Sequence, residues 1–451
     1  MKTISQLAKL GLFDARVPRY TSYPTAPHFN DAIGPAQYVN WITQIPEGAQ
    51  ISLYIHVPFC RRLCWFCACR TQGTQSDEPV RAYLQTLKAE LALLKAVLPA
   101  GVSLSRLHWG GGTPTLLKPE MMSELAAAIA EIAPFAEDYE FSVEIDPNEI
   151  DQARVTALAA AGMNRASIGV QDFDPDIQKT IGRIQSFDVT RDAADMLRAA
   201  GVRSLNADIL FGLPSQTRGR MTESVQKLLS LSPDRVALYG YAHVPWMARR
   251  QTMIPSDELP TPEERLALFD TARRLFMWDG YREIGIDHFA RPDDGLSTAL
   301  DAGHLRRNFQ GYTDDTSEVL IGVGASSISK FPQGFAQNAP STGKHTGEVR
   351  NGMFSVSRGH SFSSEDLLRA RMIEALMCDF RIDAAEMMSR FAVSKAKLQA
   401  MFREADQAFP GMIKLTDDGL FIPQEARALT RMIARVFDAY DLSKAGHSSA
   451  I

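Results

Sequence analysis

Short apolar runs rich in β-branched residues alternate with longer segments of helical periodicity from about residue 51 onward. This alternation is typical of successive βα units and predicts a parallel sheet covered by helices. The predicted strands span residues 52–57, 104–108, 139–145, 165–170, 203–210 and 235–241, with a seventh candidate at 283–288. The predicted helices span residues 81–98, 120–132, 152–161, 188–200, 222–231 and 262–278. Six such units predict an α/β fold, a partial (β/α)₆ TIM-like barrel, whose active site lies at the C-terminal ends of the strands.

The pattern weakens between residues 290 and 362 and becomes helical again near the end of the chain. Residues 365–378 and 424–440 are predicted helices, and residues 413–415 and 420–422 form a predicted hairpin between them. We therefore expect three parts: an N-terminal arm (1–45), the core barrel (46–290) and a mainly helical C-terminal domain (291–451). The hairpin makes the last part winged-helix-like, but its helices lack a one-sided basic face, which favours a lid over a DNA-binding module.

Composition excludes several classes of function. The 451 residues are 45% hydrophobic and 22% charged, as in an ordinary globular protein. A net charge of −5 gives no basic footprint for nucleic acid. No apolar run approaches the ~18 residues of a membrane span, and no signal peptide is evident. We expect a cytoplasmic protein, with a monomer as the default.

Four of the five cysteines fall within ten residues, at Cys60, Cys64, Cys67 and Cys69. Clustered thiolates are typical ligands of iron–sulfur clusters. A structural zinc site would normally draw a second ligand pair from further along the chain, and the remaining cysteine, Cys378, is distant and single. A disulfide framework does not suit an odd cysteine count in a reducing compartment. The C-x₃-C-x₂-C triplet instead resembles the signature of the radical S-adenosylmethionine (SAM) enzymes, in which three cysteines hold a [4Fe–4S] cluster.

Polar and glycine residues stand where the predicted strands end. The cysteines follow the first strand, and a glycine triplet at residues 110–112 follows the second. Glu144 and Asp146 end the third strand, Gln171 the fourth, and Asp208 lies near the end of the fifth. Each is typical of a turn or a helix cap when taken alone. Their occurrence after consecutive strands predicts a single pocket.

The chain resembles the oxygen-independent coproporphyrinogen III oxidases (radical SAM coproporphyrinogen III dehydrogenases) over nearly its full length. The resemblance rests on residues 19–25, 54–69, 108–115, 285–290 and 309–313. The cysteine triplet alone indicates radical SAM chemistry, whereas Cys69 and the arm at residues 19–25 make the resemblance specific.

This resemblance implies a role for individual residues. Cys60, Cys64 and Cys67 would ligate the [4Fe–4S] cluster, while Cys69 and Tyr54 are the candidate catalytic residues. Tyr54, Gly111, Glu144 and Ile328 resemble positions that contact the cluster-bound SAM. The positions that resemble those around a second SAM are Phe66, Gly112, Thr113, Gln171, Arg183, Asp208 and Ala242. Arg19, Arg306 and Arg307 are candidate partners for the substrate's carboxylates.

The resemblance also implies the reaction: oxidative decarboxylation of two propionates of coproporphyrinogen III to vinyl groups, which yields protoporphyrinogen IX in haem biosynthesis. A 5′-deoxyadenosyl radical derived from SAM would remove a hydrogen atom from each propionate, and an unidentified low-potential donor would reduce the cluster. Two alternatives stay open: a haem-directed radical SAM enzyme, and a haem-binding chaperone of the same superfamily. Such relatives typically lack counterparts of Cys69 and of the arm.

Overall fold

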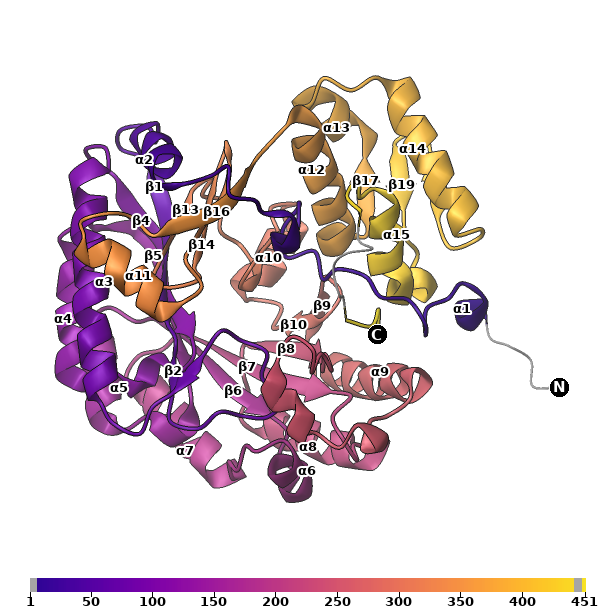
Figure 1. Ribbon diagram of the computed structural model, residues 1–451. Helices are drawn as coiled ribbons and strands as arrows, with labels where there is room; N and C mark the ends of the chain where they lie inside the picture. Colours follow the sequence, from indigo (N-terminus) through magenta and orange to yellow (C-terminus); the bar gives the residue numbers. More distant parts are fainter. Residues whose placement is uncertain (1–5, 442–447) are drawn as a thin grey trace.

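A computed structural model describes residues 6–441 and 448–451 and places most of its strands in one large sheet (Figure 1). Seven neighbouring strands of this sheet are parallel, in the order β13-β1-β4-β5-β6-β7-β8. Their bounds are β13 Leu320–Val323, β1 Gln50–Val57, β4 Ser103–Gly111, β5 Phe135–Ile145, β6 Arg165–Gln171, β7 Ser204–Phe211 and β8 Arg235–Gly240. The predicted α/β partial barrel is confirmed.

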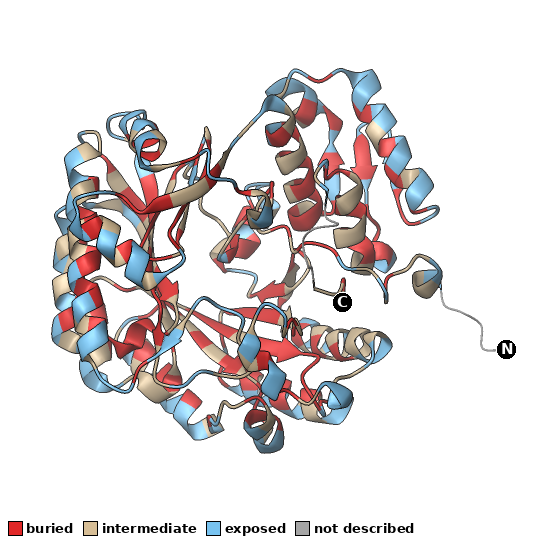
Figure 2. Ribbon diagram, in the orientation of Figure 1, coloured by how far each residue is buried: buried red, intermediate tan, exposed pale blue. Residues whose placement is uncertain are grey.

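Helices connect successive parallel strands and cover the outside of the sheet. The covering helices are α3 Glu78–Val97, α4 Pro119–Ala130, α5 Gln152–Ala160, α7 Phe187–Ala199, α8 Arg218–Ser230 and α9 Pro262–Trp278, with the short α6 Pro175–Thr180 before α7. Asp151 and Ser186 cap α5 and α7 through their side chains, and Thr261 forms a capping box with Glu264 at the start of α9. Figure 2 shows the buried strands and the exposed outer faces of the helices.

The sheet continues beyond the parallel strands at both edges. Antiparallel strands β14 Ile328–Phe331, β15 Gly334–Asn338 and β16 Val356–Ser361 extend it beyond β13. At the other edge, β10 His288–Ala290 pairs antiparallel with both β8 and β9 Arg282–Ile284. The single seventh strand expected at 283–288 is therefore wrong: Gly285, at φ 55°, turns the chain into a hairpin within it. The expected division at residue 290 stays a prediction, although the sheet itself runs on to Ser361.

The remaining strands and helices fill the edges of this framework. Short helices are α1 Gln6–Lys9, α2 Pro35–Thr43, α10 Gly295–Asp301 and α11 Thr342–Arg350. Small two-stranded pairs are β2 Phe59–Cys60 with β3 Gln72–Gly73, and β11 Arg306–Asn308 with β12 Gly311–Thr313. The 3₁₀ turns are η1 Ala26–His28, η2 Pro114–Leu116, η3 Pro147–Glu149, η4 Arg249–Met253 and η5 Ser256–Glu258.

Residues after Ser361 form a helical lobe with its own hydrophobic core. It contains α12 Ser364–Asp379, α13 Ala384–Arg390, α14 Lys395–Ala408 and a three-stranded sheet of β17 Arg381–Asp383, β19 Gly419–Phe421 and β18 Lys414–Thr416. The helix expected at 424–440 is shorter, with a 3₁₀ turn η6 Gln424–Leu429 before α15 Thr430–Val436. Past its end, Asp438 accepts hydrogen bonds from the Tyr440 N–H and from Tyr20 of the arm.

The N-terminal arm joins this lobe to the barrel. Arg431 of α15 donates to the carbonyl of Pro18, and Tyr23 accepts from the backbone N–H of Ala439. On the other side, Arg19 donates to the carbonyl of Gly240 at 2.6 Å, at the end of β8. Leu12, among the buried residues of the arm, belongs to the core of the lobe. The arm therefore lies between the lobe and the C-terminal end of the barrel strands (Figure 1).

In the part of the chain that the structure describes, no helix combines the length and the apolar character needed to cross a bilayer.

Candidate active site

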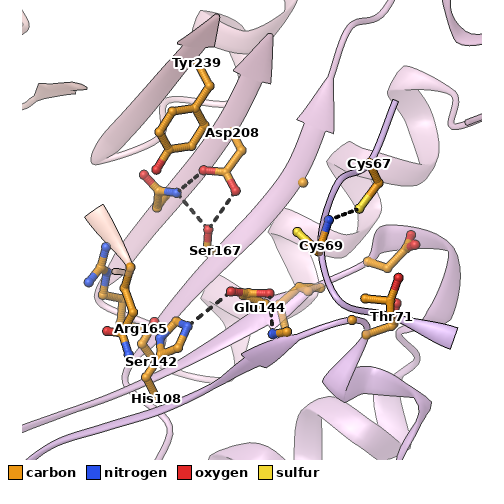
Figure 3. A pocket seen from close by; sticks show the side chains of 18 of the residues that line it. Cys67, Cys69, Thr71, His108, Ser142, Glu144, Arg165, Ser167, Asp208 and Tyr239 are labelled. Atoms are coloured by element: carbon orange, nitrogen blue, oxygen red, sulfur yellow. Dashed lines mark hydrogen bonds and ion pairs between the residues drawn. The ribbon is translucent and has the colours of Figure 1, made fainter. Parts of the chain in front are cut away.

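Alternate residues of neighbouring parallel strands line a cavity of about 340 Å³. Because successive side chains of a strand point to opposite faces, residues two apart share one face. The strand residues that meet this cavity in that way are Arg106 and His108 of β4, Ser142 and Glu144 of β5, Arg165, Ser167, Gly169 and Gln171 of β6, and Asn206 and Asp208 of β7. Register places Ser142 beside both His108 and Arg165. The inner face of the barrel is thus polar (Figure 3).

Buried ion pairs occupy the ends of these strands that lie away from the cysteines. Glu140 pairs with Arg165 at 2.9 Å, and Arg235 pairs with Asp294 at 2.7 Å. Burial alone would raise the pKa of Glu140, but Arg165 and Arg235 together lower it to about 2. These carboxylates pair with arginines of the same region, although Arg165 Nε and one terminal nitrogen of Arg235 keep no hydrogen-bond partner among the described residues. The side chains nearer the C-terminal strand ends are left available for ligands.

The cysteine-bearing loop is fixed at several points above the cavity. β2 and β3 pair in parallel and close the loop between Cys60 and Gly73. The Trp65 N–H donates to the carbonyl of Ile181, and Arg250 donates to both the carbonyl and the hydroxyl of Thr71 at 3.0 Å. These contacts come from elements far apart in the sequence. They hold the thiols against the ends of the barrel strands.

All five cysteines lie within the described residues and are free thiols, and the four clustered ones line the cavity. Burial raises the pKa of Cys60 to about 11 and also raises that of Cys64. The pKa of Cys67 is lowered to about 6 because Cys69 stabilises its thiolate, both through the neighbouring thiol and through the Cys69 N–H, which donates to the Cys67 sulfur at 3.4 Å. Figure 3 shows Cys67 and Cys69 side by side. Cys67 is thus the acceptor and Cys69 the donor of this pair.

The cysteine triplet fits an iron–sulfur cluster by its donor chemistry. Cys60, Cys64 and Cys67 are close enough for each thiolate to oppose ionisation of another. Iron would remove that repulsion by binding the thiolates. No three Cys, His, Asp or Glu side chains converge on a single metal-ion position anywhere in residues 6–441 or 448–451. A [4Fe–4S] cluster takes one thiolate per iron, so its ligands need not converge in that way.

The glycine triplet at the C-terminal end of β4 packs directly against the start of the cysteine loop. Gly111 has φ 111°, and a Cβ there would lie 2.5 Å from the His56 ring. A Cβ at Gly112 would lie 2.6 Å from the carbonyl oxygen of Phe59. The Gly112 N–H donates to the Val57 carbonyl at 2.8 Å. Close approach of the protein's own backbone therefore requires glycine here, before any ligand is considered.

Glu144 lies at the C-terminal end of β5 and connects the glycines to the barrel wall. Its carboxylate accepts from the Gly111 N–H at 3.1 Å and lies 3.4 Å from His108 Nε2. The His108 ring stacks on Tyr54, with 5.7 Å between the ring centroids. Tyr54 bonds His56 Nδ1 at 2.9 Å, and burial raises its pKa well above the ordinary value. Glu144 remains 42% exposed, so its carboxylate is open to the cavity.

Three further polar residues approach the cavity from the opposite strands. Gln171 ends β6 with φ 70°, where the pairing of β6 with β7 shifts by one residue, and such a bulge redirects a side chain. Arg183 contacts Cys64 Sγ at 3.6 Å and donates to the Gly169 carbonyl at 2.9 Å. Asp208 accepts from Asn206 at 2.8 Å, and burial raises its pKa to about 6.

The structure brings most of the predicted site residues to this cavity. Those lining it are Cys60, Cys64, Phe66, Cys67, Cys69, Gly111, Gly112, Thr113, Glu144, Gln171, Arg183 and Asp208. Tyr54 reaches its edge through the stacking on His108. Ala242 lines a second cavity instead, and Ile328 lies on β14, outside the lining of both.

Sequence reasoning missed several lining residues in the middle of strands. Ser142, Arg165, Ser167 and Asn206 line the cavity, and none of them lies at the C-terminal end of a predicted strand, where the search was made. Their signal was present in the sequence, because polar residues recur at every second position of strands that a parallel sheet would otherwise bury. Of the three candidate carboxylate partners, Arg19 and Arg307 line the second cavity. Arg306 instead donates to the carbonyls of Gly303 and Leu305.

Known proteins resemble the chain over its whole length. The model of the radical SAM superfamily matches residues 54–228. The oxygen-independent coproporphyrinogen III oxidase of Paracoccus denitrificans (strain Pd 1222) is 66% identical over 451 residues, which is all of both chains. The protein of the same name from Bradyrhizobium diazoefficiens is 41% identical and covers 97% of this chain and 98% of its own length. 

Among solved structures, the coproporphyrinogen III oxidase of Escherichia coli, described as a radical SAM enzyme, superposes with a TM-score of 0.90 at 33% identity. The match covers 95% of this chain and all of the other. Identity of this extent covers the barrel, the arm and the helical lobe together, not the superfamily core alone. The chain belongs to the oxygen-independent coproporphyrinogen III oxidases of the radical SAM superfamily.

Proposed function

We propose that Cys60, Cys64 and Cys67 hold a [4Fe–4S] cluster at the mouth of the barrel cavity, where the propionates of coproporphyrinogen III are decarboxylated. The chain is an oxygen-independent coproporphyrinogen III oxidase that acts by radical SAM chemistry in haem biosynthesis. One observation carries the site assignment: the three thiols line the same cavity as the inward-facing polar residues of consecutive strands.

When bound, the reduced cluster and SAM supply the 5′-deoxyadenosyl radical that removes a β-hydrogen atom from a propionate. Each propionate radical would then lose carbon dioxide and pass one electron to an unidentified one-electron acceptor outside the chain, which leaves a vinyl group. Two propionates react in this way, so one substrate consumes two SAM molecules. The chain's own residues bind and orient the reactants and exclude water.

Glu144 and the Gly111 backbone form the proposed binding site for the cluster-bound SAM. The Glu144 carboxylate is partly exposed and can accept hydrogen bonds from an ammonium group or from ribose hydroxyls. The Gly111 N–H orients that carboxylate at 3.1 Å. Tyr54 supports the same wall through its stacking on His108. Ile328 lies on β14 outside the lining of this cavity and stays a predicted contact of the cluster-bound SAM.

A second SAM site is proposed on the opposite wall of the cavity. Gln171, Arg183 and Asp208 approach from the ends of β6 and β7 and from the turn after α6, while Phe66 and Thr113 approach from the cysteine loop and the glycine turn. Arg183 suits a carboxylate through its planar guanidinium, and Asp208 suits hydroxyl or amino groups. Ala242 would belong to this site only through a ligand that extends toward the second cavity.

Cys69 is the proposed catalytic thiol beside the cluster. It is a hydrogen-bond donor to Cys67 and has no place among the three ligands of the triplet. The residue is exposed toward the cavity mouth, where a substrate would approach. Because Cys69 is not a cluster ligand, its thiol could deliver a proton, and its thiolate accept one, while the cluster stays bound.

The test is an anaerobic assay of the reconstituted protein with SAM, a strong reductant and coproporphyrinogen III. We expect protoporphyrinogen IX, seen as a mass loss of two formic-acid equivalents. Cys60→Ser is expected to abolish both cluster absorbance and product. Cys378→Ala, a change to the buried cysteine of α12, is the matched control and should retain both. SAM cleavage without decarboxylation would contradict the substrate assignment, and a full cluster in Cys60→Ser would contradict the ligand assignment.

Three further expectations belong to this proposal. The electron donor is a low-potential reductant that docks near the cysteine loop, the protein acts as a monomer, and it works in the cytoplasm, where a reduced cluster is maintained.

A further inference from the structure

A second, larger cavity of about 500 Å³ lies beside the first and is rich in arginine. Among the described residues, seven arginines and four carboxylates line it. We call it the arginine cavity; its arginines are Arg16, Arg19, Arg265, Arg273, Arg307, Arg427 and Arg431. The arm, α9, the β9–β10 hairpin and the helical lobe all contribute to its walls.

Some of these arginines already have carboxylate partners. Arg273 pairs with Glu283, and Arg427 lies 3.5 Å from the same carboxylate. Arg307 lies 3.7 Å from Asp287, and its Nε and one terminal nitrogen have no hydrogen-bond partner although its side chain is only 3% exposed. Arg307 thus keeps buried, unused donors beside the cavity.

Four other arginines, Arg16, Arg19, Arg265 and Arg431, form no ion pair with an Asp or Glu side chain of residues 6–441 and 448–451. Arg19 donates to the Gly240 carbonyl at 2.6 Å and Arg431 to the Pro18 carbonyl at 3.1 Å. Arg265 donates to the Tyr241 carbonyl at 2.8 Å and, through Nε, to the main-chain oxygen of Ile451, the last residue of the sequence, at 3.0 Å. Burial lowers the pKa of Arg19, lowers that of Arg265 to about 10 and lowers that of Arg431 to about 9, and the Arg19 charge adds to the effect on the other two.

Carbonyl oxygens orient these guanidinium groups, and the nearby Asp287 carboxylate, whose charge opposes the lowering of the pKa of both Arg19 and Arg431, is shared with Arg307 and does not neutralise them all. A buried charge without a counter-ion costs free energy, and a guanidinium remains charged at neutral pH. An incoming carboxylate would remove that cost and form charge-assisted hydrogen bonds at the same time. The cavity is therefore built for an anion.

Apolar side chains complete the lining. Phe211, Phe269 and Ile286 line the cavity together with Trp246, whose side chain is 54% exposed. A small inorganic anion would make no use of such surface. The combination of aromatic walls and unpaired guanidinium groups suits a large apolar ring that carries several carboxylates.

The two cavities meet at the end of β8. Tyr239 and His288 line the first cavity, whereas their chain neighbours Gly240 and Asp287 line the second. A ligand bound in the arginine cavity would therefore be separated from the cysteine-lined cavity by the width of a single residue. Arg19 of the arm lies at this boundary, through its bond to Gly240.

We propose that the arginine cavity binds the propionates of the porphyrinogen that are not reacting, with Arg19, Arg265 and Arg431 as their principal partners. This inference rests on the proposed function, because it takes coproporphyrinogen III as the substrate. One propionate points toward the cysteine-lined cavity while the others are held here by charge. The unpaired guanidinium groups thus orient the ring and select substrates with several carboxylates.

The test measures binding without turnover. Coproporphyrin III, the oxidised and unreactive counterpart with the same four propionates, is titrated by equilibrium dialysis against the cluster-loaded enzyme in the absence of SAM. Arg19→Gln and Arg265→Gln remove the charge but keep a hydrogen-bond donor, and each should weaken binding about 10-fold or more. Arg19→Lys and Arg265→Lys keep the charge and should bind within about threefold of the wild type. Arg282→Gln, which breaks an exposed pair with Asp301, should change nothing.

Three outcomes would overturn the proposal: wild-type protein that does not bind coproporphyrin III, glutamine variants that bind as well as the wild type, or lysine variants as weak as the glutamine variants. The last would show a purely structural role. Among the residues that the structure describes, the Arg19 side chain makes a single hydrogen bond, so its variants keep the test valid even if Arg265 variants fail to fold. Product formation by the wild type is measured separately. If the wild type forms product but the variants bind coproporphyrin III as tightly as it does, only the proposal for the arginine cavity is rejected. If binding depends on the arginines but the wild type forms no product, only the proposed function is rejected.

Discussion

Replacing Asp208 with asparagine should stabilise the protein while impairing it as an enzyme. Asp208 lies on β7, where its carboxylate accepts from Asn206 at 2.8 Å and lies 3.4 Å from Ser167 Oγ. Burial raises its pKa to about 6; the bond from Asn206 opposes this shift, and the negative charge of Glu144 adds to it. The positive charge of Arg165 reduces the shift.

The magnitude follows from the two pKa values. A folded-state pKa of about 6, against 3.8 for the ordinary side chain, corresponds to about 3 kcal/mol at about 1.4 kcal/mol per unit. Below pH 3.8 the group is protonated in both states and has no effect. Between pH 3.8 and 6 only the unfolded state loses the proton, so stability falls as the pH rises. Above pH 6 the carboxyl group is ionised in both states, so the loss of folding stability stays constant. Asparagine carries no charge and therefore removes this loss.

The assay compares urea unfolding of cluster-loaded, SAM-free wild type and Asp208→Asn under anaerobic conditions from pH 4.5 to 8. The variant should be more stable by up to about 3 kcal/mol at pH 8, with the difference shrinking toward the acid end. Asp195→Asn, on the exposed face of α7, should show no such trend. Equal stability at pH 8, or a difference that grows as the pH falls, would refute the reasoning. Product formation by Asp208→Asn should fall, because the carboxylate proposed to bind ligand is gone.

Three other variants test separate parts of the site. Cys69→Ser should keep full cluster absorbance but lose product, and loss of iron would contradict its exclusion from the ligands. Glu144→Gln should weaken SAM binding about 10-fold in equilibrium dialysis, because the Gly111 N–H would then orient a neutral amide; unchanged affinity would remove Glu144 from the SAM site. Tyr20→Phe breaks the buried bond to Asp438 and should lower the free energy of unfolding by about 1–2 kcal/mol, and an unchanged urea midpoint would show that this bond does not hold the arm.

Local patterns predicted much of the barrel and of the first cavity. Strand and helix periodicities extend over a few residues each, and they placed the six βα units close to their positions in the structure. The C-terminal ends of parallel strands meet at one edge of the sheet, so Glu144, Gln171 and Asp208 were predicted to lie together there. The same reasoning could have recovered Ser142 and Ser167 from their spacing.

Long-range pairings were not predictable from these patterns. β13, at Leu320–Val323, pairs in parallel with β1 although some 260 residues separate them, and β14 to β16 follow it into the sheet. Strand partners that distant depend on the packing of the whole core, which no local periodicity encodes. The hairpin at Gly285 depends likewise on the partners that β8 offers to β10.

The sequence by itself determined the chemistry. The cysteine triplet, the fourth thiol, the glycine turn and the acids at strand ends are each recognised from residue type and local spacing alone. Only the tertiary structure decided which charges go unpaired. Arg19, Arg265 and Arg431 lie in the arm, in α9 and in α15, and only Arg19 belongs to a motif that marked it in the sequence. Folding brings the three arginines into one cavity that is lined by fewer carboxylates than guanidinium groups. This excess of positive charge depends on the distances between segments far apart in the chain, not on each residue's neighbours in the sequence.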